Sequence, residues 1–141
     1  MKKAATIFIL TLMALSTLAA AQTRKIVGAE VPFEFIANGK TMPAGFYTIT
    51  VSGDPLAVLS IRSGKSFVHA LANATALSQH PVVTVLVFHR YGAQYFLSGI
   101  RWEGEDRAYE LPAGKAEMEL QSKKATEDEI GLIAAVRRSS E

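Results

Sequence analysis

The chain has 141 residues, with 15 lysines and arginines, 13 aspartates and glutamates, and a formal net charge of +2. It contains no cysteine, which excludes thiol nucleophiles, zinc–cysteine sites and iron–sulfur ligation. The length suits one domain with its own core, and the interleaving of acids and bases, without a basic stripe, argues against nucleic-acid binding.

The first 21 residues have the pattern of a cleaved secretory signal. Lys2 and Lys3 give a positive start, residues 4–18 form an apolar run, and Ala19-Ala20-Ala21 supplies the small side chains that a signal peptidase requires. The apolar run is shorter than the roughly 20 residues that a membrane span needs. We therefore predict cleavage before Gln22, a mature chain with no transmembrane segment, and a periplasmic or secreted protein.

Short strands and turns are predicted for most of the mature chain. Residues 22–30 are expected to be a lead-in and residues 31–112 a β domain. The predicted strands cover residues 31–37, 46–51, 56–62, 65–77, 82–91, 94–103 and 107–111. Alanines in the fourth of these leave a short helix open as an alternative. About seven strands with regular turns predict a single all-β domain, either an antiparallel β-sandwich or a small barrel.

The segment 82–102 gives the clearest supersecondary signal, a hairpin closed by Gly92-Ala93. Glycine in the first position of a two-residue loop is typical of a type II′ turn. Because both faces of the hairpin are apolar, we expect it to be central and covered on both sides, with Val85 facing the core. Val85→Ala would then cost about 1–3 kcal/mol. An unbroken register pairs residue 91 with 94, 90 with 95, 89 with 96, 88 with 97, 87 with 98, 85 with 100 and 83 with 102.

Residues 113–141 are predicted to form a helical or partly disordered tail. Helix formers up to residue 124, with Ala116 and Leu120 at helical spacing, predict a first short helix. A second short helix is predicted over residues 130–138. Neither helix has a wide apolar face, so the last twenty residues are expected to contribute little to folding.

Five sequence phrases are distinctive in combination: Val31-Pro-Phe-Glu-Phe35, Asn38-Gly-Lys-Thr-Met-Pro-Ala-Gly-Phe-Tyr-Thr48, Leu86-Val-Phe-His-Arg-Tyr-Gly92, Tyr95-Phe-Leu-Ser98 and Glu110-Leu-Pro112. On these phrases the chain resembles, over roughly residues 31–120, a group of small exported acidobacterial proteins with no established function. The resemblance brings no mechanism. The chain differs from the group at Ala93, where such proteins tend to carry Asp or Asn, and this difference concerns the turn type.

The candidate ligand-binding residues gather on the predicted hairpin: His89, Arg90, Tyr91, Tyr95 and Arg101. As a functional patch they would suit an anionic or carbohydrate ligand. The structural interpretation is favoured, because an Arg90–Tyr95 cation–π pair, worth about 0.5–1 kcal/mol, is a routine stabiliser of sheets.

The remaining candidates match no complete site pattern. His69, His80 and His89 lack the tight spacing of metal ligands, and the acidic loop 103–106 shares only Gly104 with a calcium loop. No phosphate-binding loop and no nucleophile elbow is complete. We therefore assign no catalytic residue, no metal and no cofactor.

The sequence thus predicts an exported, non-catalytic β domain with a binding or structural role in the cell envelope, its partner being an envelope component or a glycan. Two alternatives stay open. A small exported hydrolase would use His89 or the acidic loop, and it needs a cleft in which His89 reaches a carboxylate. A carrier of a small apolar ligand needs a hollow interior lined by Val85, Val87 and Phe96.

Overall fold

The computed structural model describes residues 24–53, 56–123, 127–133 and 135–136. In these residues all strands belong to one eleven-stranded sheet, and the one helix, α2 (Lys115–Ser122), lies in the chain between the ninth and tenth strands. The prediction of a single all-β domain with a short C-terminal helix is confirmed. The segment predicted to be a signal and the predicted cleavage site before Gln22 lie outside the described residues.

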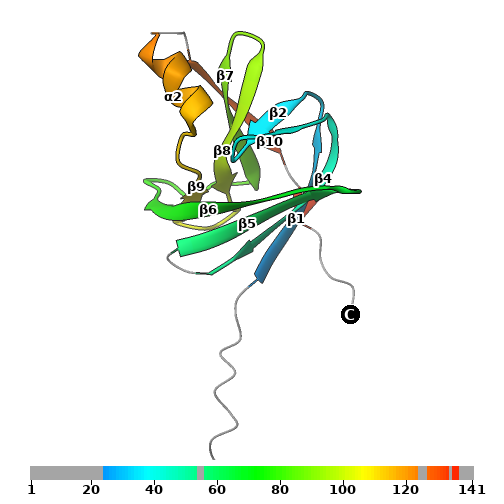
Figure 1. Ribbon diagram of the computed structural model, residues 1–141. Helices are drawn as coiled ribbons and strands as arrows, with labels where there is room; N and C mark the ends of the chain where they lie inside the picture. The colour runs from blue at the N-terminus through cyan, green and yellow to red at the C-terminus, as the bar shows by residue number, and fades with distance from the viewer. Residues whose placement is uncertain (1–23, 54–55, 124–126, 134, 137–141) are drawn as a thin grey trace, which may run out of the picture.

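The sheet curls so strongly that its two ends approach each other. The strand order is β10-β7-β8-β9-β6-β5-β4-β1-β11, and β2 pairs with β3 and, at Ile36, with β8. The hydrogen-bonded path is not closed, yet its end strands β10 and β11 are separated by a single residue in the chain. Figure 1 shows the β7–β8 hairpin standing above β6, β5 and β1, with α2 beside it. The strands are β1 (Arg24–Val31), β2 (Phe35–Ala37), β3 (Lys40–Met42), β4 (Gly45–Ser52), β5 (Leu56–Ser63), β6 (Ser66–Ala76), β7 (Val85–Tyr91), β8 (Gln94–Arg101), β9 (Arg107–Glu110), β10 (Glu127–Ile133) and β11 (Ala135–Val136).

One hydrophobic core fills the curl of the sheet. Strands β4 and β5 alternate buried with partly or fully exposed side chains, as a period of two residues requires. Their inward residues, such as Ile49 and Leu59, belong to the same buried cluster as Phe88 of β7. Tyr47 of β4 is also fully buried and donates its hydroxyl hydrogen to the Pro43 carbonyl. This burial raises the pKa of Tyr47 above its ordinary value.

The β7–β8 hairpin confirms part of the predicted register. Gly92 has a φ of 60° and Ala93 is not among the residues with positive φ, as a type II′ turn requires. The pairs from Tyr91–Gln94 to Phe88–Leu97 are as predicted. Beyond them a bulge leaves Ser98 as an extra residue in β8, so the predicted pairs 87–98, 85–100 and 83–102 are wrong, and the ladder ends at Val85–Arg101.

The bulge changes which side chains of β8 share a face with the core residues of β7. Leu86 and Phe88 lie on one face of β7, and beyond the extra Ser98 it is Ile100 that pairs with Leu86, so Leu86 is 1% exposed and Ile100 0%. Val85 lies on the other face of β7 and is only partly buried. The expected core position of Val85 is therefore wrong. At Gly99 the strands β8 and β9 approach so closely that a Cβ atom would lie 2.4 Å from the Tyr109 carbonyl oxygen. The hairpin is nevertheless covered on both faces, as expected.

The N-terminal part of the domain differs from the predicted boundaries. Residues 24–30, expected to be a lead-in, form most of β1. The single strand predicted over residues 31–37 is split, because Val31 ends β1 and β2 begins only at Phe35. Pro32 lies at the break and has no N–H group to donate to a ladder. The alternative helix at residues 65–77 is not formed, since β6 is a continuous strand of 11 residues.

The C-terminal segment combines one correct prediction and one error. The first predicted helix is α2, but residues 127–133 form β10 instead of the start of a second helix. Strand β10 pairs antiparallel with β7 from Tyr91 to Val85, and β11 pairs with β1. A weak local preference for helix is overridden because the edge of β7 offers unpaired backbone groups. This segment was expected to contribute little to folding, but its strands β10 and β11 are hydrogen-bonded members of the sheet.

Candidate functional site

The five predicted site residues lie on opposite faces of the β7–β8 hairpin and form no common patch. Directly paired residues share a face, so Arg90 and Tyr95 lie on one side of the hairpin. His89 pairs with Phe96 and Arg101 pairs with Val85, and the period of two residues puts these on the other side with Tyr91.

Arg90 and Tyr95 are engaged in contacts within the domain. The Arg90 guanidinium donates to Asp128 of β10, with an Nη2–Oδ2 distance of 2.6 Å. This hydrogen bond, and then one with Tyr95, raises the pKa of Arg90 above its ordinary value. The Tyr95 ring stacks on Phe33 with 3.8 Å between ring centroids. The structure thus gives both residues a bracing role at the end of the hairpin.

Glu117 of α2 is the functional residue that the sequence analysis missed. Among the described residues it is the one buried charged side chain, with 5% exposed. Its Oε1 atom lies 2.8 Å from Nδ1 of His89 and accepts a hydrogen bond of 3.1 Å from the Tyr91 hydroxyl. The Nε2 group of Gln121 donates in turn to the Tyr91 oxygen at 3.0 Å. We call these four residues the α2 cluster.

The α2 cluster has the geometry of a fastening network. A buried carboxylate is costly unless donors surround it, and His89 and Tyr91 supply two. Because a carboxylate only accepts, the imidazole donates from Nδ1. The cluster therefore attaches the helix to β7 and fixes the orientation of the His89 ring.

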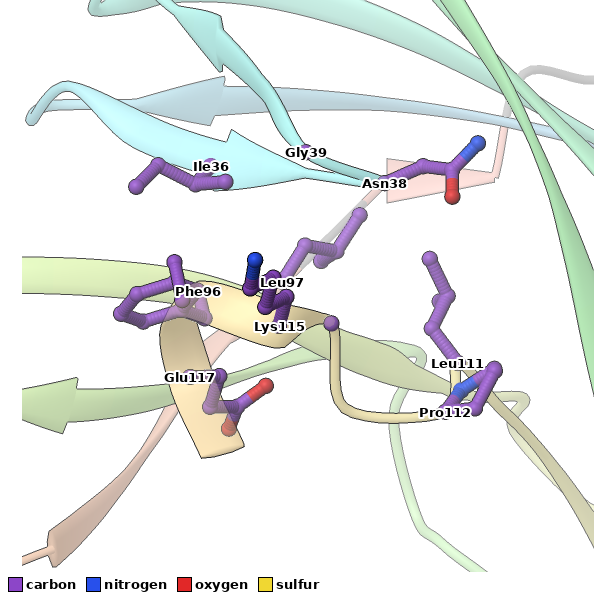
Figure 2. Close-up of a pocket in the computed structure, with 11 residues that line it drawn as sticks. Ile36, Asn38, Gly39, Phe96, Leu97, Leu111, Pro112, Lys115 and Glu117 are labelled. Carbon is purple, nitrogen blue, oxygen red and sulfur yellow. The ribbon is translucent and has the colours of Figure 1, made fainter. Parts of the chain in front are cut away.

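A cavity of about 250 Å³ lies between α2, the β2–β3 hairpin and β8. Figure 2 shows Ile36 and Asn38 on one side of it, Glu117 on the other, and Leu111 with Pro112 at one end. The volume is somewhat below the roughly 300–1,000 Å³ of ordinary ligand pockets. Its Glu117 is already bonded to His89 and Tyr91, so this carboxylate is not open to a ligand in the cavity.

A second, smaller cavity of about 170 Å³ lies beside His89. Arg101, Glu110 and Glu129 also line it, and Arg101 pairs with Glu129 at 3.1 Å. His89 thus has both features expected of a hydrolase, a carboxylate within reach and a cleft beside it. The carrier alternative gains no support, because its three residues do not line one hollow interior. Phe96 lines the cavity beside α2, Val87 lines the cavity beside His89, and Val85 lines a separate hollow next to residues 77–83.

A third hollow, which we call the outer groove, runs over the outer face of β1, β4, β5 and β6. It has a volume of about 330 Å³. Cross-strand register places Thr50 opposite Ser60 and Ser60 opposite His69, whose Nδ1 atom lies 2.8 Å from the Ser60 Oγ. The groove is lined by Arg24, Thr48, Thr50, Ser52, Ser60, Ile61, Arg62, Phe67 and His69.

The other candidates from the sequence are placed apart from these sites. In the acidic loop 103–106, Glu105 forms an ion pair with Lys25, and none of its acids lines the cavities beside α2 and His89 or the outer groove. Across the described ranges, no three His, Asp or Glu side chains gather as metal ligands would. No helix in this part of the chain is long and apolar enough to cross a membrane.

Comparison with protein-family models, with curated proteins and with solved structures gives no match for this chain. The sites must therefore be interpreted from their own chemistry. The outer groove had a signal in the sequence, since Thr48, Thr50 and Ser52 recur at every second position of a strand. Glu117 had none, because an acid in a helix of mostly polar residues is usually solvated.

Proposed function

We propose that this protein is an exported, non-catalytic β domain that binds a glycan of the cell envelope on its outer groove. The observation that carries the proposal is the lining of the groove by outward-facing, partly buried hydroxyl residues beside an exposed aromatic ring. The groove faces outward from the sheet, whereas the polar groups of the α2 cluster bond to one another.

The side chains of the groove suit the chemistry of a sugar. The hydroxyls of Thr48, Thr50 and Ser52 each donate and accept, as sugar hydroxyls do. Phe67 is 50% exposed, and its ring offers an apolar surface for the C–H face of a pyranose. The outer face of the sheet thus offers a sugar both hydrogen-bonding groups and an apolar ring in one groove.

The same lining favours binding over cleavage. Glycoside hydrolysis ordinarily needs two carboxylic acids on either side of the bond to be broken. Among the described residues, those that line the groove include no Asp and no Glu. A glycan in the groove would therefore be held without an acid to protonate its leaving oxygen.

Export supports an envelope or extracellular ligand. The proposal keeps the sequence-based expectation that residues 1–21 are removed and that the protein is periplasmic or secreted. Mass analysis of the chain recovered from its own envelope tests this, with Gln22 as the expected first residue. Recovery of a chain that still begins at Met1 would contradict export.

The test of glycan binding uses the chain from Gln22 and a panel of soluble polysaccharides: dextran, xylan, polygalacturonate and peptidoglycan fragments. We expect affinity electrophoresis to show retention by at least one of them, without shortening of the polysaccharide. Phe67→Ala should abolish retention. Phe46→Ala is the matched control, because Phe46 is equally exposed, at 50%, and does not line the groove. No retention by any polysaccharide, or equal loss in both variants, would contradict the proposal.

A small exported hydrolase is the second candidate, because His89 is held by a buried carboxylate beside a cavity. Turnover of 4-nitrophenyl acetate and 4-nitrophenyl glycosides by the exported chain tests it. A hydrolase should lose at least 100-fold in rate in His89→Gln, since one acid–base group contributes about 10²–10⁴-fold. Turnover that His89→Gln leaves unchanged would contradict this candidate.

A further inference from the structure

We infer that the glycan bound by the outer groove is acidic, a polysaccharide whose repeating sugars carry carboxylate groups. This inference rests on the proposed glycan binding and adds the charge and length of the ligand. It is carried by Arg24 and Arg62, which line the groove together.

The two arginines differ from Arg90 and Arg101 of the hairpin in their charge partners. Within the described ranges neither of them forms a salt bridge, whereas Arg90 and Arg101 are paired with acids of β10. Both arginines are exposed, and an exposed guanidinium keeps its five donors for a ligand. Carboxylate and phosphate groups are the anions that such a donor fork binds with two parallel hydrogen bonds.

The register of the strands shows that the arginines do not grip one anion together. Arg24 faces Ser52 and Arg62 faces Thr48 across β4. These partners are four residues apart on β4, about 13 Å at roughly 3.3 Å per residue, and the arginines lie on opposite sides of that strand. Each arginine therefore meets a separate anionic group, which requires an extended chain with repeated charges. The hydroxyls of β4 lie between the two positions and face the sugar rings.

The surrounding charges agree with an anionic ligand. The Lys40 ammonium lies 5.4 Å from the centroid of the Phe67 ring and donates to the Phe67 carbonyl, so a third cation stands at the edge of the groove. On the outward positions of β1 the acid is Glu30, which faces Phe46 and lies outside the groove. In the part of the groove that the structure describes, the ligand thus meets positive charge at both ends and no carboxylate between them.

A nucleic acid fits these observations less well than a polyuronate. Nucleic-acid binding rests on neutralising many phosphates at once, and the groove supplies two arginines and a neighbouring lysine. Nor does an anionic membrane surface need a row of hydroxyls between its cations. An acidic polysaccharide carries both spaced negative charges and hydroxyl groups, so it matches the arginines and the hydroxyl residues of the groove.

The experiment titrates the exported chain with polygalacturonate oligomers and with the same oligomers after methyl esterification, which removes the charge and keeps the sugar. We expect the ester to bind at least tenfold more weakly. Arg24→Gln/Arg62→Gln should weaken binding of the acidic oligomer at least tenfold. Lys115→Gln/Lys123→Gln, which removes two exposed charges at the ends of α2 and outside the groove, should stay within twofold.

The outcomes separate this inference from the proposed function. Equal binding of acid and ester would overturn the acidic ligand and leave glycan binding standing, whereas no binding of either would count against both. Inorganic polyphosphate or phosphatidylglycerol vesicles binding as tightly as polygalacturonate would show recognition of charge alone and would overturn the inference. The comparison of acid with ester needs no variant, so it decides the matter even if the double variant does not fold.

Discussion

The α2 cluster and the outer groove both gather polar side chains on strands of one sheet, but they use them in opposite ways. In the α2 cluster, Glu117, His89 and Tyr91 are bonded to one another and largely covered by the helix. In the outer groove, Thr48, Thr50 and Arg62 face outward on an open surface.

This difference gives a way to distinguish polar groups that stabilise the fold from polar groups that bind a ligand, even without a bound ligand. Buried polar groups are stabilising only when each has a partner, so their removal should reduce stability. Outward polar groups already have water as a partner, so their removal should leave stability unchanged and affect binding alone. Substitutions in the two regions should therefore have opposite readouts.

The largest effect is expected from removing the strand that supports β7, on which the α2 cluster stands. Truncation after Lys123 deletes β10 and β11, and with them the pairing of β10 along the whole of β7. Backbone hydrogen bonds of roughly 0.5–1.5 kcal/mol each, together with lost burial, give a loss on the order of 5 kcal/mol. Urea denaturation of the truncated chain measures it. A melting temperature within a couple of degrees of the intact chain would show that β10 is not part of the stable sheet.

The next effect tests which face of β7 packs on the core. Leu86→Ala should cost about 2–5 kcal/mol because the side chain is 1% exposed and leaves a cavity. Val85→Ala should cost less than about 1 kcal/mol because that side chain is only partly buried. The two free energies of unfolding, measured in urea, decide the matter. The reverse order would show that the face of β7 that carries Val85 is the one packed on the core.

These two predictions also mark how far the sequence could specify the fold. The turn at Gly92 and the first four pairs of the hairpin follow from local rules, since a two-residue loop fixes its neighbours. The bulge at Ser98 does not, because it occurs where β8 passes close to β9 at Gly99, a contact between strands distant in sequence. Strand β10 was missed for the same reason, as its pairing depends on the free edge of β7.

The candidate sites divide in the same way. Alternation of hydroxyl residues along β4 could be seen in the sequence, but the groove also needs Arg62, Phe67 and His69 from two further strands. The positions of these three residues beside β4 depend on the register between strands, which a single sequence does not reveal. The contact between Glu117 and His89 joins residues 28 positions apart on a helix and a strand. Helical periodicity directed attention to Ala116 and Leu120, so the buried acid between them was overlooked.

A smaller effect is expected inside the α2 cluster. Glu117→Ala should cost about 1–3 kcal/mol, because it leaves the donors of His89 and Tyr91 without their acceptor. Glu117→Gln keeps an acceptor oxygen and should cost less. Glu119→Ala on the exposed side of the same helix is the control and should stay within about 0.5 kcal/mol. Polygalacturonate binding should be unchanged in all three, and a loss of binding in Glu117→Gln would place the ligand at the helix instead.

The smallest effect on stability is expected in the outer groove. Thr50→Val removes one outward hydroxyl and keeps a β-branched side chain on the strand, so the free energy of unfolding should change by less than about 0.5 kcal/mol. Binding of polygalacturonate should nevertheless fall severalfold, since a sugar hydroxyl loses its partner. Thr41→Val, an exposed threonine of β3 outside the groove, should alter neither quantity. If Thr50→Val instead lowered stability by more than 1 kcal/mol and left binding intact, the hydroxyls of the groove would be fastening groups like those of the α2 cluster, and the contrast between the two regions would fail.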